Sequence, residues 1–213
     1  MAAYTTINKS TDYFNTKLYT ADGTTSQNIT GVGFQPDWVW IKNRGTTDDN
    51  VVHDAVRGAG KRIKPNATAA ESTVTNQITS FDSDGFTTSN STDTGANSNN
   101  YVAWNWKAGT TGSGTTTGSG TGKAYSYSVN TTAGFSIVAY GGNGSSGHTI
   151  PHHLGAAPSV VFIKNLSDSE EWRCGFTALS SNFSSGVHLS TNDGAWTQSG
   201  AFNDTAPSST VFT

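Results

Sequence analysis

The sequence has few charged residues, one cysteine and no long hydrophobic run. Charged side chains make up 13% of the 213 residues, and glutamate occurs only at Glu71, Glu170 and Glu171. The single Cys174 excludes an intrachain disulfide and a cysteine metal cluster, so we expect a small buried residue there. No stretch approaches the roughly 18 apolar residues of a membrane span, and residues 1–4 begin no secretion signal. These absences predict a soluble chain without membrane insertion.

The charge balance argues against a nucleic-acid partner. A formal net charge of -3 provides no electrostatic attraction for a polyanion. The one basic cluster consists of Arg57, Lys61, Arg62 and Lys64. Neither a basic stripe nor an aromatic RNA-binding motif accompanies it, so we interpret it as a solvated turn.

Small polar residues and aromatic residues are abundant instead. Thr, Ser, Asn and Gly account for 101 of the 213 residues, and these residue types favour turns and strands over helices. Aromatic residues make up 11% of the chain, which disordered chains rarely reach and which supplies large core side chains. The sequence therefore predicts an all-β protein, with residues 51–62 as the one place for a short helical turn.

An internal repeat divides the chain into two copies. Residues 19–43 match residues 140–165, and both stretches run from a tyrosine through a glycine turn and a proline to Ile-Lys-Asn. Residues 83–87 match 209–213 in the same way. Self-similarity of this kind predicts two tandem β-sandwich repeats, one over residues 1–108 and one over residues 124–213.

The core strands follow from the apolar pattern. Residues 38–41 and 160–163 are apolar on both faces, as central strands are. In residues 101–106 the alternating Val102, Trp104 and Trp106 predict one core-facing side. The second copy has no counterpart of this strand, so either the protein is longer or another chain supplies the strand at an exposed edge.

Residues 109–123 separate the two copies. The stretch from 109 to 122 contains only Gly, Ser and Thr. Such composition behaves as a flexible coil, and we expect a linker with an end-to-end distance of about 20 Å.

Motifs for catalysis and metal binding are missing or weak. No serine lies in a G-x-S-x-G turn and no phosphate-binding loop is complete, so we expect no enzyme, no catalytic residue and no cofactor. His148, His152 and His153 offer metal ligands, but a polar loop is the favoured interpretation. Asp82 and Asp84 resemble the start of a calcium loop, yet a hairpin turn is favoured over a metal site.

Carbohydrate binding is the remaining possibility, because aromatic rings stack on sugars and polar side chains bind their hydroxyls. Trp38, Trp40, Trp104 and Trp106 lie in the predicted core strands and are interpreted as structural. The candidate ligand-binding residues are Trp172, Asn192, Asp193 and Trp196. Trp196 follows a loop signature, so it stands exposed in one interpretation and packs in the core in the other.

The repeated motifs resemble a known family. Residues 31–44, with Pro36 before the strand, together with 80–86 and 101–109, are similar to a repeat in virion surface proteins of marine tailed phages, especially those infecting cyanobacteria. Residues 132–165 resemble the same repeat. The resemblance implies tail-fibre or appendage proteins with a jelly-roll sandwich like that of concanavalin A-like lectins.

Two functions of different classes follow from this resemblance. The first is a tail fibre or receptor-binding appendage that contacts host surface polysaccharide, as a homo-oligomer and preferably a trimer. The alternative is a capsid-decorating or head-fibre protein with an assembly role, and a polysaccharide depolymerase ranks third. Each implies other virion proteins as partners and a virion location, and the absence of disulfides fits assembly in the host cytoplasm.

Overall fold

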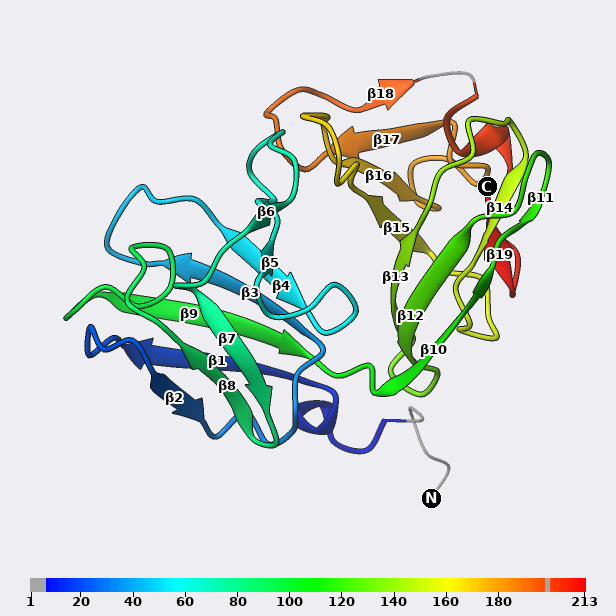
Figure 1. Ribbon diagram of the computed structural model, residues 1–213. Coiled ribbons are helices and arrows are strands. Elements are labelled where there is room, and N and C mark those ends of the chain that lie inside the picture. The colour runs from blue at the N-terminus through cyan, green and yellow to red at the C-terminus, as the bar shows by residue number, and fades with distance from the viewer. Residues whose placement is uncertain (1–6, 198–199) are drawn as a thin grey trace.

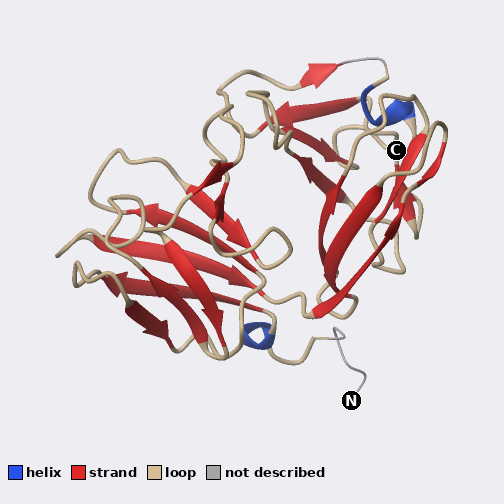
Figure 2. Ribbon diagram, in the orientation of Figure 1, coloured by secondary structure: helices blue, strands red, loops and turns tan. Residues whose placement is uncertain are grey.

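The computed structural model describes residues 7–197 and 200–213 and confirms the all-β prediction (Figures 1 and 2). Its helical content in these residues is two short 3-10 segments, η1 (Ser10–Asp12) and η2 (Ala201–Asp204). No helix in the described ranges has the length and apolar character needed to cross a membrane. All strand pairs that the structure describes are antiparallel.

The strands fall into two units, which we call the first unit (residues 7–108) and the second unit (the described part of 109–213). The strands of the first unit are β1 (Phe14–Thr20), β2 (Gln27–Thr30), β3 (Trp38–Asn43), β4 (Val51–Asp54), β5 (Lys61–Arg62), β6 (Ser72–Thr73), β7 (Ile78–Asp82), β8 (Gly85–Thr88) and β9 (Asn100–Trp106). The strands of the second unit are β10 (Thr110–Thr115), β11 (Thr117–Gly118), β12 (Ala124–Asn130), β13 (Phe135–Tyr140), β14 (His148–Pro151), β15 (Val160–Ile163), β16 (Arg173–Phe176), β17 (Ser185–His188), β18 (Trp196–Thr197) and β19 (Val211–Phe212). Residues 51–62, expected as a possible helical turn, form β4, a turn and β5 instead.

The first unit is a sandwich of two sheets. One sheet has the order β1-β9-β3-β4, and the other has the order β2-β8-β7. Buried side chains from both sheets, among them Ile41, Tyr101 and Phe86, form one core cluster between them. Alternate residues of a strand point to opposite faces, so each strand of the larger sheet has one face in this core.

The structure corrects the expected core face of β9. Tyr101, Ala103 and Asn105 are the fully buried residues, whereas Val102, Trp104 and Trp106 are only partly buried. The tryptophans of β3, Trp38 and Trp40, are also partly buried and lie on the same outer face of the sheet. The hydrophobic pattern identified the strand but assigned its larger rings to the wrong side, because part of the outer face, at Trp38, Trp40 and Trp106, packs against the second unit.

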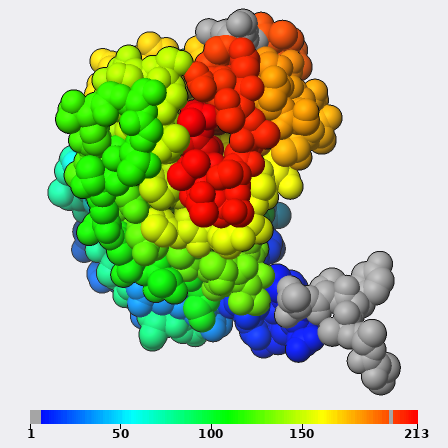
Figure 3. Space-filling view, turned by 90° about the vertical axis from the view of Figure 1, so that its right-hand side faces the viewer, coloured from blue at the N-terminus to red at the C-terminus, as the bar shows by residue number. Residues whose placement is uncertain are grey.

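Strand pairs in the second unit join residues that correspond, in the repeat, to the paired residues of the first unit. Trp38 pairs with Asp54 between β3 and β4, and Val160 pairs with Phe176 between β15 and β16, which are the corresponding positions of the repeat. Ile29 faces Phe86 between β2 and β8, as Ile150 faces Phe212 between β14 and β19. Figure 3 shows the C-terminal residues in red on one face of the second unit.

The repeated Ile-Lys-Asn motif builds the same loop in both units. Lys42 Nζ donates to the carbonyl oxygens of Thr46 and Asp48, at 3.0 and 2.6 Å. Lys164 Nζ donates in the same way to the carbonyl oxygens of Asp168 and Glu170, at 3.5 and 2.8 Å. The lysine therefore has the same structural role in both copies, since it donates hydrogen bonds to backbone carbonyl oxygens of the loop that follows the strand.

The expected flexible linker over residues 109–123 is wrong. Residues 110–115 form β10, which pairs along its whole length with β12, and residues 117–118 form β11, which pairs with β14. Gly112 and Gly114 lie against the rings of Tyr127 and Tyr125. A composition typical of coil is accommodated in a sheet because the glycines leave room for the tyrosine rings of the neighbouring strand.

The two units pack against each other through the outer face of the first sheet. Trp38, Trp40 and Ile63 of the first unit share a cluster with Trp172 and Cys174 of the second. Asp37 joins the units, because its carboxylate accepts a hydrogen bond from Ser128 Oγ of the second unit at 3.2 Å, and it also accepts one at 2.9 Å from the N–H of Ala108, the last residue of the first unit. As expected from the sequence, Cys174 is fully buried, and burial raises the pKa of its thiol to about 11.

Candidate binding sites

A cluster of polar side chains beside a tryptophan lies at the end of the β16-β17-β18 sheet. Glu171, His188 and Asp193 place one ligand atom each within 4.8 Å of one another. Glu171 Oε2 lies 2.9 Å from His188 Nδ1, and the His188 ring stacks on Trp196 at a centroid distance of 6.2 Å. We call Glu171, His188, Asp193 and Trp196 the loop cluster. It combines an aromatic ring, on which a sugar can stack, with two carboxylates, which can bind sugar hydroxyls.

The sheet positions these groups through close packing at one glycine. Trp196 in β18 pairs with Gly186 in β17, and Arg173 in β16 pairs with His188. A Cβ atom at Gly186 would overlap both the Cys174 carbonyl oxygen and the Trp196 ring. Gly186 therefore allows the tryptophan to lie flat on the strand beside His188.

The four residues predicted to bind a ligand differ in their exposure to solvent. Asn192 and Asp193 are exposed, and Asp193 joins the loop cluster with the partly buried Trp196. Trp172 is 2% exposed, and its Nε1–H donates to the Lys64 carbonyl oxygen at 2.9 Å, so its ring offers no open face to a sugar. Glu171 and His188 were not anticipated from the sequence, because they approach Asp193 only through the pairing of β16 with β17.

The histidines singled out as possible metal ligands are engaged separately. His148 Nε2 lies against Thr116 Oγ1, His152 Nε2 lies 3.1 Å from the Ser208 carbonyl oxygen, and His153 stacks on Tyr127 at 3.7 Å. Among the described residues, the one grouping with metal-ligand proximity is Glu171, His188 and Asp193. In that grouping the imidazole is already paired with the Glu171 carboxylate.

Asp82 and Asp84 occupy the hairpin between β7 and β8. Asp82 pairs with Gly85, and the carboxylate of Asp84 accepts hydrogen bonds from Gly31 N–H and Gly33 N–H at 2.9 and 2.6 Å. A Cβ at Gly85 would overlap the Ile29 carbonyl oxygen, which explains the glycine. The hairpin-turn interpretation of this stretch agrees with these contacts.

A cleft of about 490 Å³ lies between the two units. It is lined by Trp38, Arg57 and Ile63 of the first unit and by β13, β15 and the residues after β15 in the second. Its volume is in the usual range of ligand sites. The lining is mainly apolar, with the Arg57 guanidinium as a cationic group.

Arg57 is held in the cleft wall by two carboxylates. Its Nε donates to Asp54 Oδ2 at 2.6 Å and its Nη1 donates to Glu71 Oε2 at 3.0 Å. The side chain is 7% exposed, and Nη2 is buried without a hydrogen-bond partner among the described residues. A buried N–H group without an acceptor is costly.

The interpretation of the basic cluster as a solvated turn is therefore wrong. Arg62 is also largely buried and pairs with Asp93 at 3.2 Å, and Lys64 pairs with Asp49 at 2.7 Å. Only Lys61 of the four is substantially exposed. Asp54 lies three residues from Arg57, but the other acidic partners are 10 to 31 residues away in the chain, and tertiary packing brings them to the cations.

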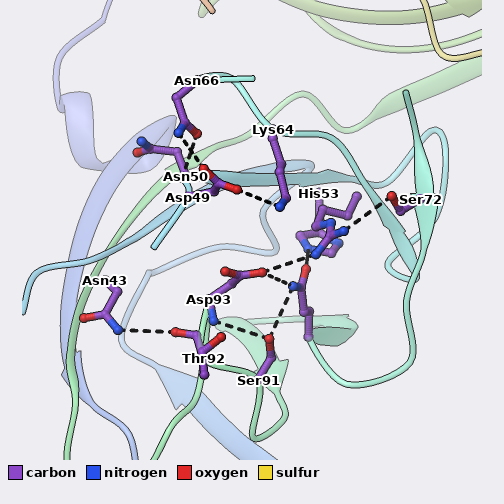
Figure 4. A network of polar contacts seen from close by, with 12 residues as sticks. Asn43, Asp49, Asn50, His53, Lys64, Asn66, Ser72, Ser91, Thr92 and Asp93 are labelled. Carbon is purple, nitrogen blue, oxygen red and sulfur yellow. Dashed lines mark hydrogen bonds and ion pairs between the residues drawn. The ribbon is translucent and has the colours of Figure 1, made fainter. Parts of the chain in front are cut away.

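A network of polar contacts that includes His53 lies within the first unit (Figure 4). His53 is fully buried, with Nδ1 2.7 Å from the Ala59 carbonyl oxygen and Nε2 3.0 Å from Gln77 Oε1. Gln77 Nε2 donates to Asp93 Oδ2 at 2.6 Å. Burial lowers the pKa of His53 to about 4, more than its two hydrogen bonds raise it. Buried and neutral, His53 has a structural role here.

Comparison with known protein families gives a match over most of the chain. Residues 9–213 match the family described as "Domain of unknown function (DUF7483)". No curated protein and no solved structure matches the chain.

Proposed function

The chain belongs to the protein family described as "Domain of unknown function (DUF7483)", and we propose that it is a virion surface protein of a tailed phage. In this proposal it is a tail fibre or receptor-binding appendage, and the loop cluster contacts polysaccharide of the host surface. The motif resemblance over residues 31–44, 80–86 and 101–109 supports the phage assignment.

The loop cluster is the observation that carries the binding role. Asp193 and Trp196 were selected from the sequence for sugar contact, and folding brings them to Glu171 and His188. Glu171 is 39% exposed and Asn192 and Asp193 are exposed, so hydrogen-bonding groups are accessible beside a ring. His188 and Trp196 lie on the paired strands β17 and β18, which fixes the spacing of these two side chains and limits the entropy lost on binding.

The proposal assigns binding rather than catalysis to this cluster. We further propose that the protein acts as a homotrimer, because weak single sugar sites gain avidity when several are linked. Size measurement by light scattering checks this assembly directly.

The binding test uses recombinant protein and a panel of purified bacterial lipopolysaccharides and capsular polysaccharides. We expect one or more preparations to bind, and the variants Asp193→Asn and Trp196→Ala to weaken that binding about tenfold or more. Asp12→Asn, a matched change at an exposed carboxylate of the first unit, serves as the control. Binding that is unchanged in both cluster variants would contradict the assignment of the site.

A capsid-decorating or head-fibre protein is the second candidate, and the unpaired edges of β13 and β15 favour it, since free strand edges serve assembly. Location in an intact virion separates the two functions. Density of this protein on the capsid lattice would exclude the tail-fibre proposal, and density at the tail would support it.

A further inference from the structure

One strand position in the main sheet of the second unit is unoccupied. In the first unit β9 lies between β1 and β3 and pairs antiparallel with both. The corresponding strands of the second unit are β13 and β15, and each ends its sheet in the described part of the chain. β13 pairs with β12 and β15 pairs with β16, so the edges that β9 would join have no partner strand. We call this position the open slot.

The residues of β15 are more exposed than their counterparts in β3. Val39 and Ile41 are fully buried, whereas the matching Val161 and Ile163 are partly exposed. On the other face Val160 is 44% exposed and Phe162 is 45% exposed, which makes them two of the most exposed large apolar residues described. β3 has a neighbouring strand at each edge, whereas β15 pairs with β16 at one edge and has no neighbour at the other in the described part of the chain.

The open slot coincides with the cleft between the units. Ile137 to Tyr140 of β13 and Phe162 to Ile163 of β15 line this cleft, with Trp38 of the first unit opposite.

We propose that the open slot binds an extended polypeptide segment with the residue pattern of β9, which adds to the sheet as an antiparallel strand between β13 and β15. Main-chain hydrogen bonds to two free edges would hold it, as in other cases of strand addition. This goes beyond the proposed polysaccharide binding, because it concerns a different surface and a peptide ligand.

The chemistry of the occupant follows from β9, which fills the same position in the first unit. Its buried face carries Tyr101, Ala103 and Asn105, and its outer face carries Val102, Trp104 and Trp106. By the repeat register, the position of Trp104 falls between Ile137 and Phe162, and the position of Ala103 falls between Val138 and Ile163. The bound segment therefore has aromatic or branched residues outward and a small residue at the inward centre.

The slot is also continuous with the established contact between the units, which sets what the outer face of the strand meets. Phe135 at the start of β13 already packs on Trp38 and Trp106, with centroid distances of 6.4 and 6.1 Å. An apolar outer face would extend this aromatic contact along the cleft. A strongly charged segment would bury its charges without partners, so it is disfavoured.

The test uses the full chain and a fluorescent synthetic peptide that copies residues 99–108. We expect saturable binding by fluorescence polarisation, and backbone amides of β13 and β15 to gain protection from hydrogen exchange. Phe162→Asp places a charge on an already exposed side chain in the slot, so it should weaken binding about tenfold or more while the protein stays folded. Leu179→Asp, at a residue that is 49% exposed and outside the cleft lining, is the matched control and should bind normally.

Other results would overturn the proposal. Equal binding of a peptide carrying Ala103→Lys would show that the strand pattern is not recognised. Protection confined to β1 and β3 would mean that the peptide exchanges with β9. Dimerisation of the protein alone that Phe162→Asp abolishes would assign the slot to a second copy of the chain. Retained peptide binding in Asp193→Asn separates this inference from the polysaccharide proposal.

Discussion

The stability of the first unit should fall as the pH drops through the range in which His53 is protonated only in the unfolded chain. Its pKa is about 4 in the folded protein, against 6.5 for an unperturbed histidine. Because the folded pKa is the lower one, the unfolded chain takes up a proton first, and stability rises with pH between about 4 and 6.5. This stabilisation is fully present above pH 6.5 and is lost as the pH falls.

The size of the effect follows from the shift. At about 1.4 kcal/mol per pKa unit, the free energy of unfolding should fall by about 2 kcal/mol between pH 7.5 and pH 5, and by on the order of 3 kcal/mol in total. Because the His53 ring is fully buried, solvent does not screen this electrostatic effect. Carboxylates whose pKa is lowered, such as Asp49, lose their contribution mainly at lower pH.

Urea denaturation followed by tryptophan fluorescence at pH 7.5, 6.5, 5.5 and 5.0 measures this dependence. His53→Gln should be less stable at pH 7.5, since it disturbs the network with Gln77, but its stability should change much less between pH 7.5 and 5. Ile41→Val, a destabilising core change that keeps His53, should retain the wild-type pH dependence. Parallel pH profiles for wild type and His53→Gln would refute the assignment of the effect to this residue.

Two further predictions concern packing. Gly186→Ala should lower the free energy of unfolding by about 1–3 kcal/mol, because the new Cβ overlaps the Cys174 carbonyl oxygen and the Trp196 ring, whereas Gly194→Ala, with open space around it, should change it little; chemical denaturation compares the two. Asp37→Ala should cost about 1–3 kcal/mol, because it leaves the buried Ala108 N–H without its acceptor, and proteolysis near residues 107–110 should become faster than in the exposed-site control Asp12→Ala. A wild-type cleavage rate in Asp37→Ala would show that this carboxylate does not fix the contact between the units.

The sequence located several strands correctly, but it did not predict the residues that pack against them. Continuous apolar runs located β3 and β15, and alternation of apolar residues located β9. Pro36 and Pro158 marked where β3 and β15 begin. It failed over residues 109–123, where a run of Gly, Ser and Thr has no hydrophobic pattern. That run is a strand because Tyr125 and Tyr127 of β12 supply the rings that pack over its glycines.

The candidate sites show the same limit. Asp193 and Trp196 were proposed as ligand contacts because a loop signature and a tryptophan can be recognised in the local sequence. Glu171 and His188 were missed, since 17 positions separate them and only the pairing of β16 with β17 brings them together. Trp172 was misplaced because the residue type does not reveal that the first unit covers it.

What the sequence alone determined is the repeat, because two stretches with the same residue pattern meet the same local demands and fold alike. It also determined the fold class, through the scarcity of helix formers and the abundance of rings and branched residues. Only the tertiary structure decided which face of each strand is buried and how the basic residues are neutralised. These depend on contacts between residues far apart in the chain, in which burial and charge pairing override what each residue favours by itself.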